Sequence, residues 1–254
     1  MVQFCANEVL KGNVPFRKVN VPFNSDANIR ADRSRAEACG PRYDRLMMIE
    51  TRDRTFAAIQ RIGSLITPGM TEEQGIAVAR QVLREDGLLR GWHGINLRFG
   101  INTIHTFDAK SEPGVVLGEN DVFFVDIGPV WRHWEGDGGD TFTNGSDPEM
   151  NRIAHDVKAV FEAVRSRWQQ DGLTGEALYK VAVDESEARG WILNREMTGH
   201  RVSEFPHAAH YDGALADASF VPSSGLWILE IQLRHPTRRF GAFYEDLLLD
   251  AVDA

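Results

Sequence analysis

Four carboxylates stand inside apolar runs of the chain, where a buried strand ordinarily has none. Asp126 lies in "VFFVDIGPVW" and Asp137 follows eleven positions later, while Glu230 and Glu245 lie within "GLWILEIQLRHP" and "GAFYEDLLLDAV". An ionised carboxylate inside a sheet costs several kcal/mol unless it is paired or binds a metal ion. One such residue alone is more simply a strand-end side chain that faces solvent. Four of them together indicate a shared cation site.

Histidines that suit such a site follow in the second half of the chain. The segment "MTGHRVSEFPHAAHYDG" contains His200, His207 and His210. Neutral imidazoles beside carboxylates are a common ligand set for divalent transition metals. Bridging and terminal carboxylates with one histidine suit two ions about 3.5 to 4 Å apart, which activate a shared water for hydrolysis. We therefore expect Asp126 and Asp137 on neighbouring strands, with both side chains at the same ions.

The elements that must position these residues repeat along the chain. From Tyr43 onward each half reads as a helix, a turn, a capped helix, a glycine stop and then strands, with an offset of 103 residues. Two matched glycines alone are weak evidence, but a matched N-cap between them favours an internal repeat. The pattern predicts an α+β fold of two similar halves, near 43–148 and 149–254. The matched positions are Gly69 and Gly172, Thr71 and Thr174, and Gly87 and Gly190.

Composition excludes several classes of function. The chain has 254 residues, of which 43% are hydrophobic and 26% charged, as in an ordinary globular protein. Its formal net charge of −9 argues against nucleic acid as a partner, because a phosphate backbone requires clustered Lys and Arg. The two cysteines, Cys5 and Cys39, are too few for a disulfide framework or a thiolate zinc site.

The N-terminus and the hydropathy pattern indicate a location. The start "MVQFCANEVLKGNVPF" lacks the charged beginning and apolar core of a signal peptide, and nowhere do about eighteen apolar residues run together. We therefore expect a cytoplasmic protein that does not enter a membrane. Residues 1–41 are polar and interrupted by Pro and Gly, which predicts an irregular N-terminal arm.

Five segments resemble the pita-bread metallopeptidase family, which includes methionine aminopeptidase, aminopeptidase P and prolidase. In order, they are "FGINTIHTF", "VDIGPVWRHWEGDGGDTF", "GHRVSEFPH", "LEIQL" and "YEDLLL". The resemblance covers the chain from about Tyr43 to the C-terminus. It implies a creatinase-like pita-bread fold, in which two pseudo-symmetric α+β halves surround a curved antiparallel sheet. It also implies a single catalytic domain over 42–254.

The same resemblance implies a role for individual residues and two divalent metal ions, of Mn, Co, Fe or Zn. Asp137 and Glu245 would bridge both ions, and Glu230 would bind one ion and carry the proton of the attacking water. His105 and His207 match two family histidines that contact substrate and stabilise the tetrahedral intermediate. The implied metal ligands are Asp126, Asp137, His200, Glu230 and Glu245.

A dinuclear hydrolase follows as the expected function. The resemblance implies an aminopeptidase that removes an N-terminal residue, Xaa-Pro or similar, from a peptide or small amide by a metal-bridged hydroxide, in a homodimer. Two departures favour an alternative, an enzyme of this fold that acts on a small non-peptide metabolite. The family has a "GIG" type loop where this chain has "RVSE", and Pro-Gly where Ile231 and Gln232 follow Glu230. A non-catalytic binding module is the third hypothesis.

Other polar and aromatic residues have simpler explanations. Asp140 fits a loop position or a hydrogen bond that orients a ligand. The aromatic residues around His133 fit a pocket wall or a dimer contact equally well. We expect His210 and His235 beside the ligands or at the surface, and His93 and His155 at the surface.

Overall fold

The computed structural model describes residues 41–251, with side chains from Arg45 onward. The predicted arm at 1–41 lies outside the described residues except for Pro41. In the described part of the chain, no helix combines the length and the apolar character needed to cross a membrane. The helices are α2 (Pro41–Leu65), α3 (Glu72–Glu85), α4 (Pro148–Asp171) and α5 (Gly175–Ala188).

Local capping chemistry determines where the second helix of each pair begins and ends. Thr71 caps α3 through a capping box with Gln74, and Thr174 caps α5 by accepting from the Ala177 amide. Both helices are followed by a glycine with positive φ, Gly87 at 73° and Gly190 at 80°. The predicted repeat of helix pairs is therefore confirmed.

Strands from the two halves form one antiparallel sheet, in the order β1-β2-β5-β9-β8-β6, with β7 paired to β8. The first half supplies β1, β2 and β5 and the second supplies β9, β8 and β6, so the halves meet where β5 pairs with β9. The strands are β1 (Asn96–Phe99), β2 (Asp121–Ile127), β5 (Gly138–Asn144), β6 (Ile192–Leu193), β7 (His200–Arg201), β8 (Trp227–Arg234) and β9 (Gly241–Leu247). A separate hairpin joins β3 (Val130–Trp131) to β4 (Trp134–Glu135), and short 3-10 turns are η1 (Gly100–Ile104), η2 (His207–Ala209) and η3 (Leu215–Asp217).

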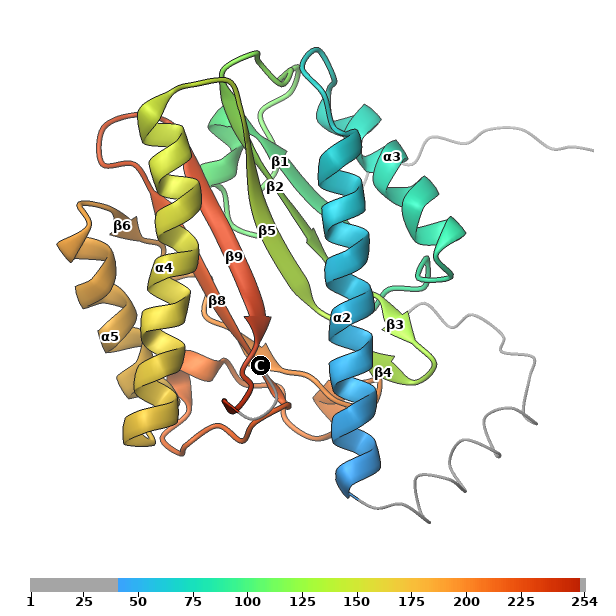
Figure 1. Ribbon diagram of the computed structural model, residues 1–254, viewed down its shortest axis with the longest axis vertical. Helices are drawn as coiled ribbons and strands as arrows, with labels where there is room; N and C mark the ends of the chain where they lie inside the picture. The colour runs from blue at the N-terminus through green and yellow to red at the C-terminus, as the bar shows by residue number, and fades with distance from the viewer. Residues whose placement is uncertain (1–40, 252–254) are drawn as a thin grey trace, which may run out of the picture. The chain divides into compact units, whose positions relative to one another are not determined.

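Helices cover one face of this sheet, with α2 and α4 running over its strands (Figure 1). Val125 and Ile127 of β2 share a buried cluster with residues of α2 and α3, and Leu229 and Ile231 of β8 share one with residues of α4 and α5. Successive side chains of a strand point to opposite faces. The residue between each pair, Asp126 or Glu230, therefore points away from the helices.

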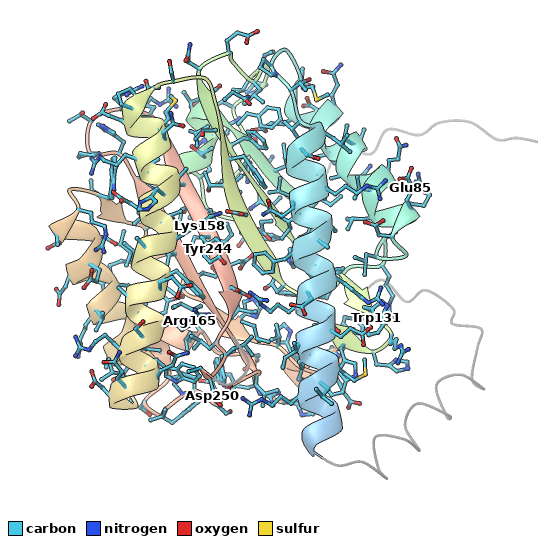
Figure 2. The ribbon with its side chains drawn as sticks, viewed as in Figure 1. Glu85, Trp131, Lys158, Arg165, Tyr244 and Asp250 are labelled. Atoms are coloured by element: carbon cyan, nitrogen blue, oxygen red, sulfur yellow. The ribbon has the colours of Figure 1, made fainter. Side chains whose placement is uncertain are left out.

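Polar residues on the helix-covered face tie the helices to the sheet. Asp140 of β5 is buried and accepts hydrogen bonds from Gln60 of α2 at 2.8 Å and from Lys158 of α4 at 2.8 Å. Lys158 also lies near the ring of Tyr244, where both side chains fill the space between α4 and the sheet (Figure 2). The loop position predicted for Asp140 is wrong, because Asp140 lies within β5 and its side chain points toward the helices.

Candidate metal centre

The strand register places three of the predicted carboxylates in one row across the sheet. Asp126 of β2 is opposite Gly139 of β5, Gly139 is opposite Glu245 of β9, and Glu245 is opposite Glu230 of β8. Directly opposite residues of antiparallel strands share a face. The three carboxylates, all buried, therefore project to the face that the helices leave open.

Gly139 supplies the space in the middle of this row. A Cβ atom at this position would lie 2.5 Å from the ring of Phe243 and 3.2 Å from Cγ of Glu245. Phe243 is fully buried and has no free volume to move into. Only glycine fits between Asp126 and Glu245 without displacing Phe243 or Glu245.

Asp137 completes the group from the segment that leads into β5. Its Oδ2 lies 2.8 Å from Nε2 of His200, which β7 holds beside β8 through the pairing of His200 with Ile228. The same His200 nitrogen lies 3.8 Å from Oε1 of Glu230. The five predicted ligands thus come together in space from both halves of the chain.

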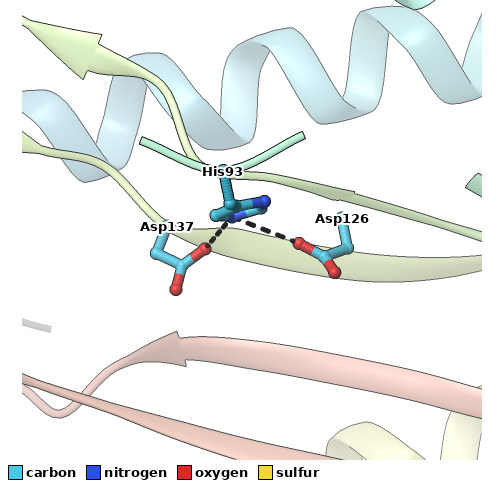
Figure 3. Close-up of side chains that lie close together, drawn as sticks. All are labelled: His93, Asp126 and Asp137. Atoms are coloured by element: carbon cyan, nitrogen blue, oxygen red, sulfur yellow. Dashed lines mark hydrogen bonds and ion pairs between the residues drawn. The ribbon is translucent and has the colours of Figure 1, made fainter. Parts of the chain in front are cut away.

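His93 belongs to the same cluster, and its predicted surface position is wrong. Its side chain is 8% exposed, and its Nε2 lies 3.1 Å from Oδ1 of Asp137 and 3.7 Å from Oδ1 of Asp126 (Figure 3). The ring packs where Gly128 has no side chain, since a Cβ there would lie 2.1 Å from Cδ2 of His93. His155, by contrast, has 80% of its side chain exposed, as predicted.

Trp92 holds the histidines of the site together. Its ring makes edge contacts with His93, His200 and His207, with centroid separations of 4.4, 5.0 and 5.0 Å. Its Nε1 donates to the carbonyl of Gly136 at 2.9 Å, which anchors the ring beside Asp137. Trp92 is not among the predicted site residues.

A buried carboxylate, Glu135, positions His207. Its Oε2 lies 2.9 Å from Nδ1 of His207, and its Oε1 accepts from the His207 amide at 2.9 Å. The His207 ring is stacked on His200 with centroids 5.3 Å apart. Glu135 is also absent from the predicted site, although it lies two positions before Asp137 in the same glycine-rich segment.

Among the described residues, the other predicted histidines form no hydrogen bond or ion pair with the carboxylates of the predicted ligand set. His105 follows η1, its carbonyl accepts from Gln232, and its buried Nε2 has no hydrogen-bond partner among the described residues. It is not among the residues that line the cavity described below. His210 is exposed, whereas His235 is buried against Trp191 and bonded to Glu149, so it is neither beside the ligands nor at the surface.

One of the aromatic residues around His133, Trp134, departs from its predicted setting. Trp134 is 6% exposed and belongs to a buried cluster with Met48 and Val202. The ring of Trp131 lies under the guanidinium group of Arg54 at 4.3 Å. Trp134 is therefore a core residue, and neither pocket wall nor exposed contact describes it.

A cavity of about 270 Å³ opens over the carboxylate row. Its lining includes the carboxylates with His93 and His200, and also the apolar side chains of Phe107, Met197 and Trp92. Such a combination of polar and apolar lining residues is typical of a site for a small ligand.

Burial and neighbouring charges shift the pKa values of the carboxylates that line the cavity. Burial raises the pKa of Asp126 to about 6 and that of Glu230 to about 7. Burial and repulsion by the neighbouring carboxylates raise the pKa of Glu245 well above its usual range. Burial also raises the pKa of Asp137, but hydrogen bonds from His200 and His93 outweigh it and lower the value to about 2. A cation would relieve this concentration of negative charge.

The donor set fits a divalent metal ion. Oε1 of Glu245 is buried without a hydrogen-bond partner among the described residues, so an oxygen lone pair is available in the middle of the row. Nδ1 of His200 donates to the carbonyl of Arg201 at 2.9 Å, which leaves Nε2 as the donor atom toward a metal. Carboxylate oxygens with imidazole nitrogen are ligands of Zn, Mn, Fe and Co in proteins.

Comparisons with known proteins agree with this site. The model of Metallopeptidase family M24 matches residues 47–249, while no curated protein matches the chain. X-Pro aminopeptidase from Thermotoga maritima MSB8 is similar with a TM-score of 0.69 and 17% identity, covering 87% of this chain and 62% of that one. Xaa-Pro dipeptidase from Bacillus anthracis has a TM-score of 0.64 and 20% identity over 83% of this chain and 59% of that one.

A third similar structure is closer to this chain in length. Methionine aminopeptidase from Thermotoga maritima has a TM-score of 0.63 and 17% identity, covering 83% of this chain and 94% of that one. The chain spans only 62% of the X-Pro aminopeptidase and 59% of the prolidase from Pyrococcus horikoshii OT3. At these sequence identities the solved structures show only a shared fold, whereas the match to the family model shows which family the chain belongs to. The predicted pita-bread fold is confirmed, and the chain belongs to Metallopeptidase family M24.

Proposed function

We propose that this protein is a dinuclear metal-dependent aminopeptidase that removes an N-terminal residue, Xaa-Pro or similar, from a short peptide. The observation that carries the proposal is the buried row of Asp126, Glu245 and Glu230, completed by Asp137 and His200. Structures titled X-Pro aminopeptidase and Xaa-Pro dipeptidase among its neighbours support the substrate class. The catalytic domain would span 42–254.

Two divalent ions, of Mn, Co, Fe or Zn, would be held by both halves of the chain. Glu245 lies between Asp126 and Glu230 in the row, which supports a bridging role, and Asp137 has one oxygen directed to each side. When bound, such ions polarise a carbonyl and lower the pKa of water toward neutrality.

The protein's own groups would then move the protons. Burial raises the pKa of Glu230 to about 7 in the metal-free protein, and its carboxyl group lines the cavity where the water would attack. Glu230 accepts the proton of the attacking water and delivers it to the leaving nitrogen. His207, fixed at Nδ1 by Glu135, presents Nε2 to the carbonyl oxygen as negative charge develops there. A substrate contact for His105 stays a prediction.

The cavity favours a small substrate. Its volume of about 270 Å³ lies just below the range of ligand pockets, which are roughly 300–1,000 Å³. Phe107 and Met197 provide apolar walls for one side chain of the peptide. A short peptide fits this space better than a loop of a folded protein does.

The structure explains one of the two departures that favour a non-peptide substrate. Nε2 of Gln232 donates to the carbonyls of Thr103 and His105 at 3.0 and 2.9 Å, so this residue anchors η1 to β8. Arg201, of the "RVSE" segment, bonds to Ser203. The hypothesis of a small non-peptide substrate therefore depends on the "RVSE" segment alone. Cytoplasmic location and a homodimer remain proposals from sequence composition and fold analogy.

A peptide screen tests the proposed function. Protein purified without chelators is assayed on Xaa-Pro and Met-Xaa peptides with added Mn, Co, Fe or Zn. We expect hydrolysis of at least one class, lost with EDTA, restored by metal and lost in Glu230→Gln. Cleavage of no peptide by protein that retains its metal would contradict the aminopeptidase. It would favour the non-peptide substrate, and absence of any metal uptake would favour a binding module.

A further inference from the structure

A second imidazole faces Asp137 from the side opposite His200. We propose that His93 is a direct metal ligand, so that each of the two ions receives one imidazole and the centre has six protein ligands. This inference rests on the proposed dinuclear centre and adds a ligand that the family resemblance does not imply. The segment Gly91–Ile95, just before β1, would thereby become part of the metal site.

Distances within the cluster suit a single ion. Two atoms that bind one ion lie roughly 3 to 4 Å apart, because each lies about 2.0 to 2.2 Å from the metal. Nε2 of His93 lies 3.1 Å from Oδ1 of Asp137 and 3.7 Å from Oδ1 of Asp126. One donor atom from each of the three residues lies within 4.8 Å of the other two. Figure 3 shows the two carboxylates converging on the same edge of the ring.

Hydrogen bonding at the far side of the ring selects the donor atom. Nδ1 of His93 lies 2.7 Å from the carbonyl oxygen of Gly94, and a carbonyl only accepts, so Nδ1 carries the proton. Nε2 is then the ring atom that faces the two carboxylates, where it carries a second proton in the metal-free protein and would offer a lone pair to a metal ion. A metal ion would take the place of that proton in this arrangement. His200 repeats it, with Nδ1 bonded to the carbonyl of Arg201.

His93 and His200 lie on opposite sides of Asp137, one from each half of the chain. The first half supplies Asp126 from β2 and His93, and the second supplies Glu230 from β8 and His200. Asp137 lies between them, with Oδ1 toward His93 and Oδ2 toward His200. Each ion would thus receive one imidazole, one terminal carboxylate and one oxygen of Asp137.

The packing of His93 is built into the fold. Gly128 leaves the space that the ring occupies, and Trp92 donates its amide to the Gly128 carbonyl at 2.9 Å. The ring of Phe107 closes the other side, with centroids 5.3 Å apart. The imidazole therefore has little freedom to turn away from the carboxylates.

A cobalt titration tests the assignment independently of catalysis. Co²⁺ binding is followed by calorimetry and by visible absorption, which reports ligand type and geometry, on wild type and on His93→Gln and His93→Ala. His155→Ala, at an exposed histidine, is the matched control. We expect wild type to bind two Co²⁺ ions. In both His93 variants, the affinity for one of these ions should be at least about 10-fold weaker, and the visible spectrum should be altered. The control should match wild type.

A further variant displaces the ring without removing it. Gly128→Ala places a Cβ 2.1 Å from Cδ2 of His93 and should weaken the same ion, with circular dichroism showing retained fold. Two ions bound by the His93 variants with wild-type affinity and spectrum would overturn the inference while leaving the dinuclear centre intact. No binding by wild type would instead overturn the proposed function.

Discussion

Glu135 holds His207 at two points, through Nδ1 of the ring and through the backbone amide, both at 2.9 Å. Its carboxylate is 1% exposed and also accepts from the amide of Ser203 at 3.3 Å. This buried side chain therefore binds the segment after β7 to β4, in addition to backbone hydrogen bonds from Glu135 to Ser203 and from Phe205 to His133. Through this residue, the hairpin that precedes Asp137 sets the orientation of His207 beside His200.

The role of Glu135 predicts a split between catalysis and metal binding. In Glu135→Gln the amide cannot accept from both Nδ1 and the backbone as the carboxylate does, so His207 loses its fixed orientation. We expect kcat on a cleaved peptide to fall about 10- to 100-fold, with metal content and KM nearly unchanged. Steady-state kinetics and elemental analysis check this. The exposed Glu187→Gln is the control, and an unchanged kcat would refute the role.

Gly139 predicts a change in both stability and metal affinity. Gly139→Ala forces the Cβ against Phe243 and Glu245, and such overpacking costs about 1–3 kcal/mol. We expect a lower free energy of unfolding by urea and weaker metal binding, because Glu245 is displaced. Gly118→Ala, where the nearest atom lies 3.4 Å from the added Cβ, should change neither. Equal stability of Gly139→Ala and wild type would show that a Cβ atom fits at position 139 beside Phe243 and Glu245.

Protonation predicts that metal affinity rises with pH. Burial lowers the pKa of His93, but Asp126 and Asp137 outweigh it and raise the value to about 9 in the metal-free protein. Burial likewise lowers the pKa of His200, while Asp137 raises it to about 9. Both rings are protonated at pH 7, so a bound ion must displace protons.

Calorimetry in buffers of different ionisation enthalpy measures this release. Affinity should increase between pH 6 and pH 9 by about 10-fold per pH unit for each proton displaced. The protonated rings compete with the metal below the pKa, and that competition disappears as pH rises through it. A metal affinity that stays constant over this range would mean that neither imidazole loses a proton to the metal.

Local signals in the sequence predict much of the fold. Thr71 and Thr174 cap their helices and Gly87 and Gly190 end them because these effects involve only neighbouring backbone. The apolar runs also predict the strands that carry Asp126, Glu230 and Glu245. A carboxylate between two residues that pack on the helices must point to the other face.

The site residues that the sequence does not predict, His93 and Glu135, are positioned by tertiary contacts. His93 lies in a short irregular segment, and only the space at Gly128 brings it to the carboxylates. Gly91 and Gly94 around Trp92 and His93 are the available signal, since glycines beside two large rings indicate close packing. Glu135 pairs with a residue 72 positions away, a distance at which spacing carries no information.

Metal content is the most direct test of the dinuclear centre. Protein purified without chelators is analysed by elemental mass spectrometry for wild type, Asp137→Ala and the exposed control Asp184→Ala. The predicted result is up to two transition ions per chain in wild type and in the control, falling sharply in Asp137→Ala because both ions lose a shared ligand. No bound metal in wild type, and none taken up on titration with Mn, Co, Fe or Zn, would contradict it.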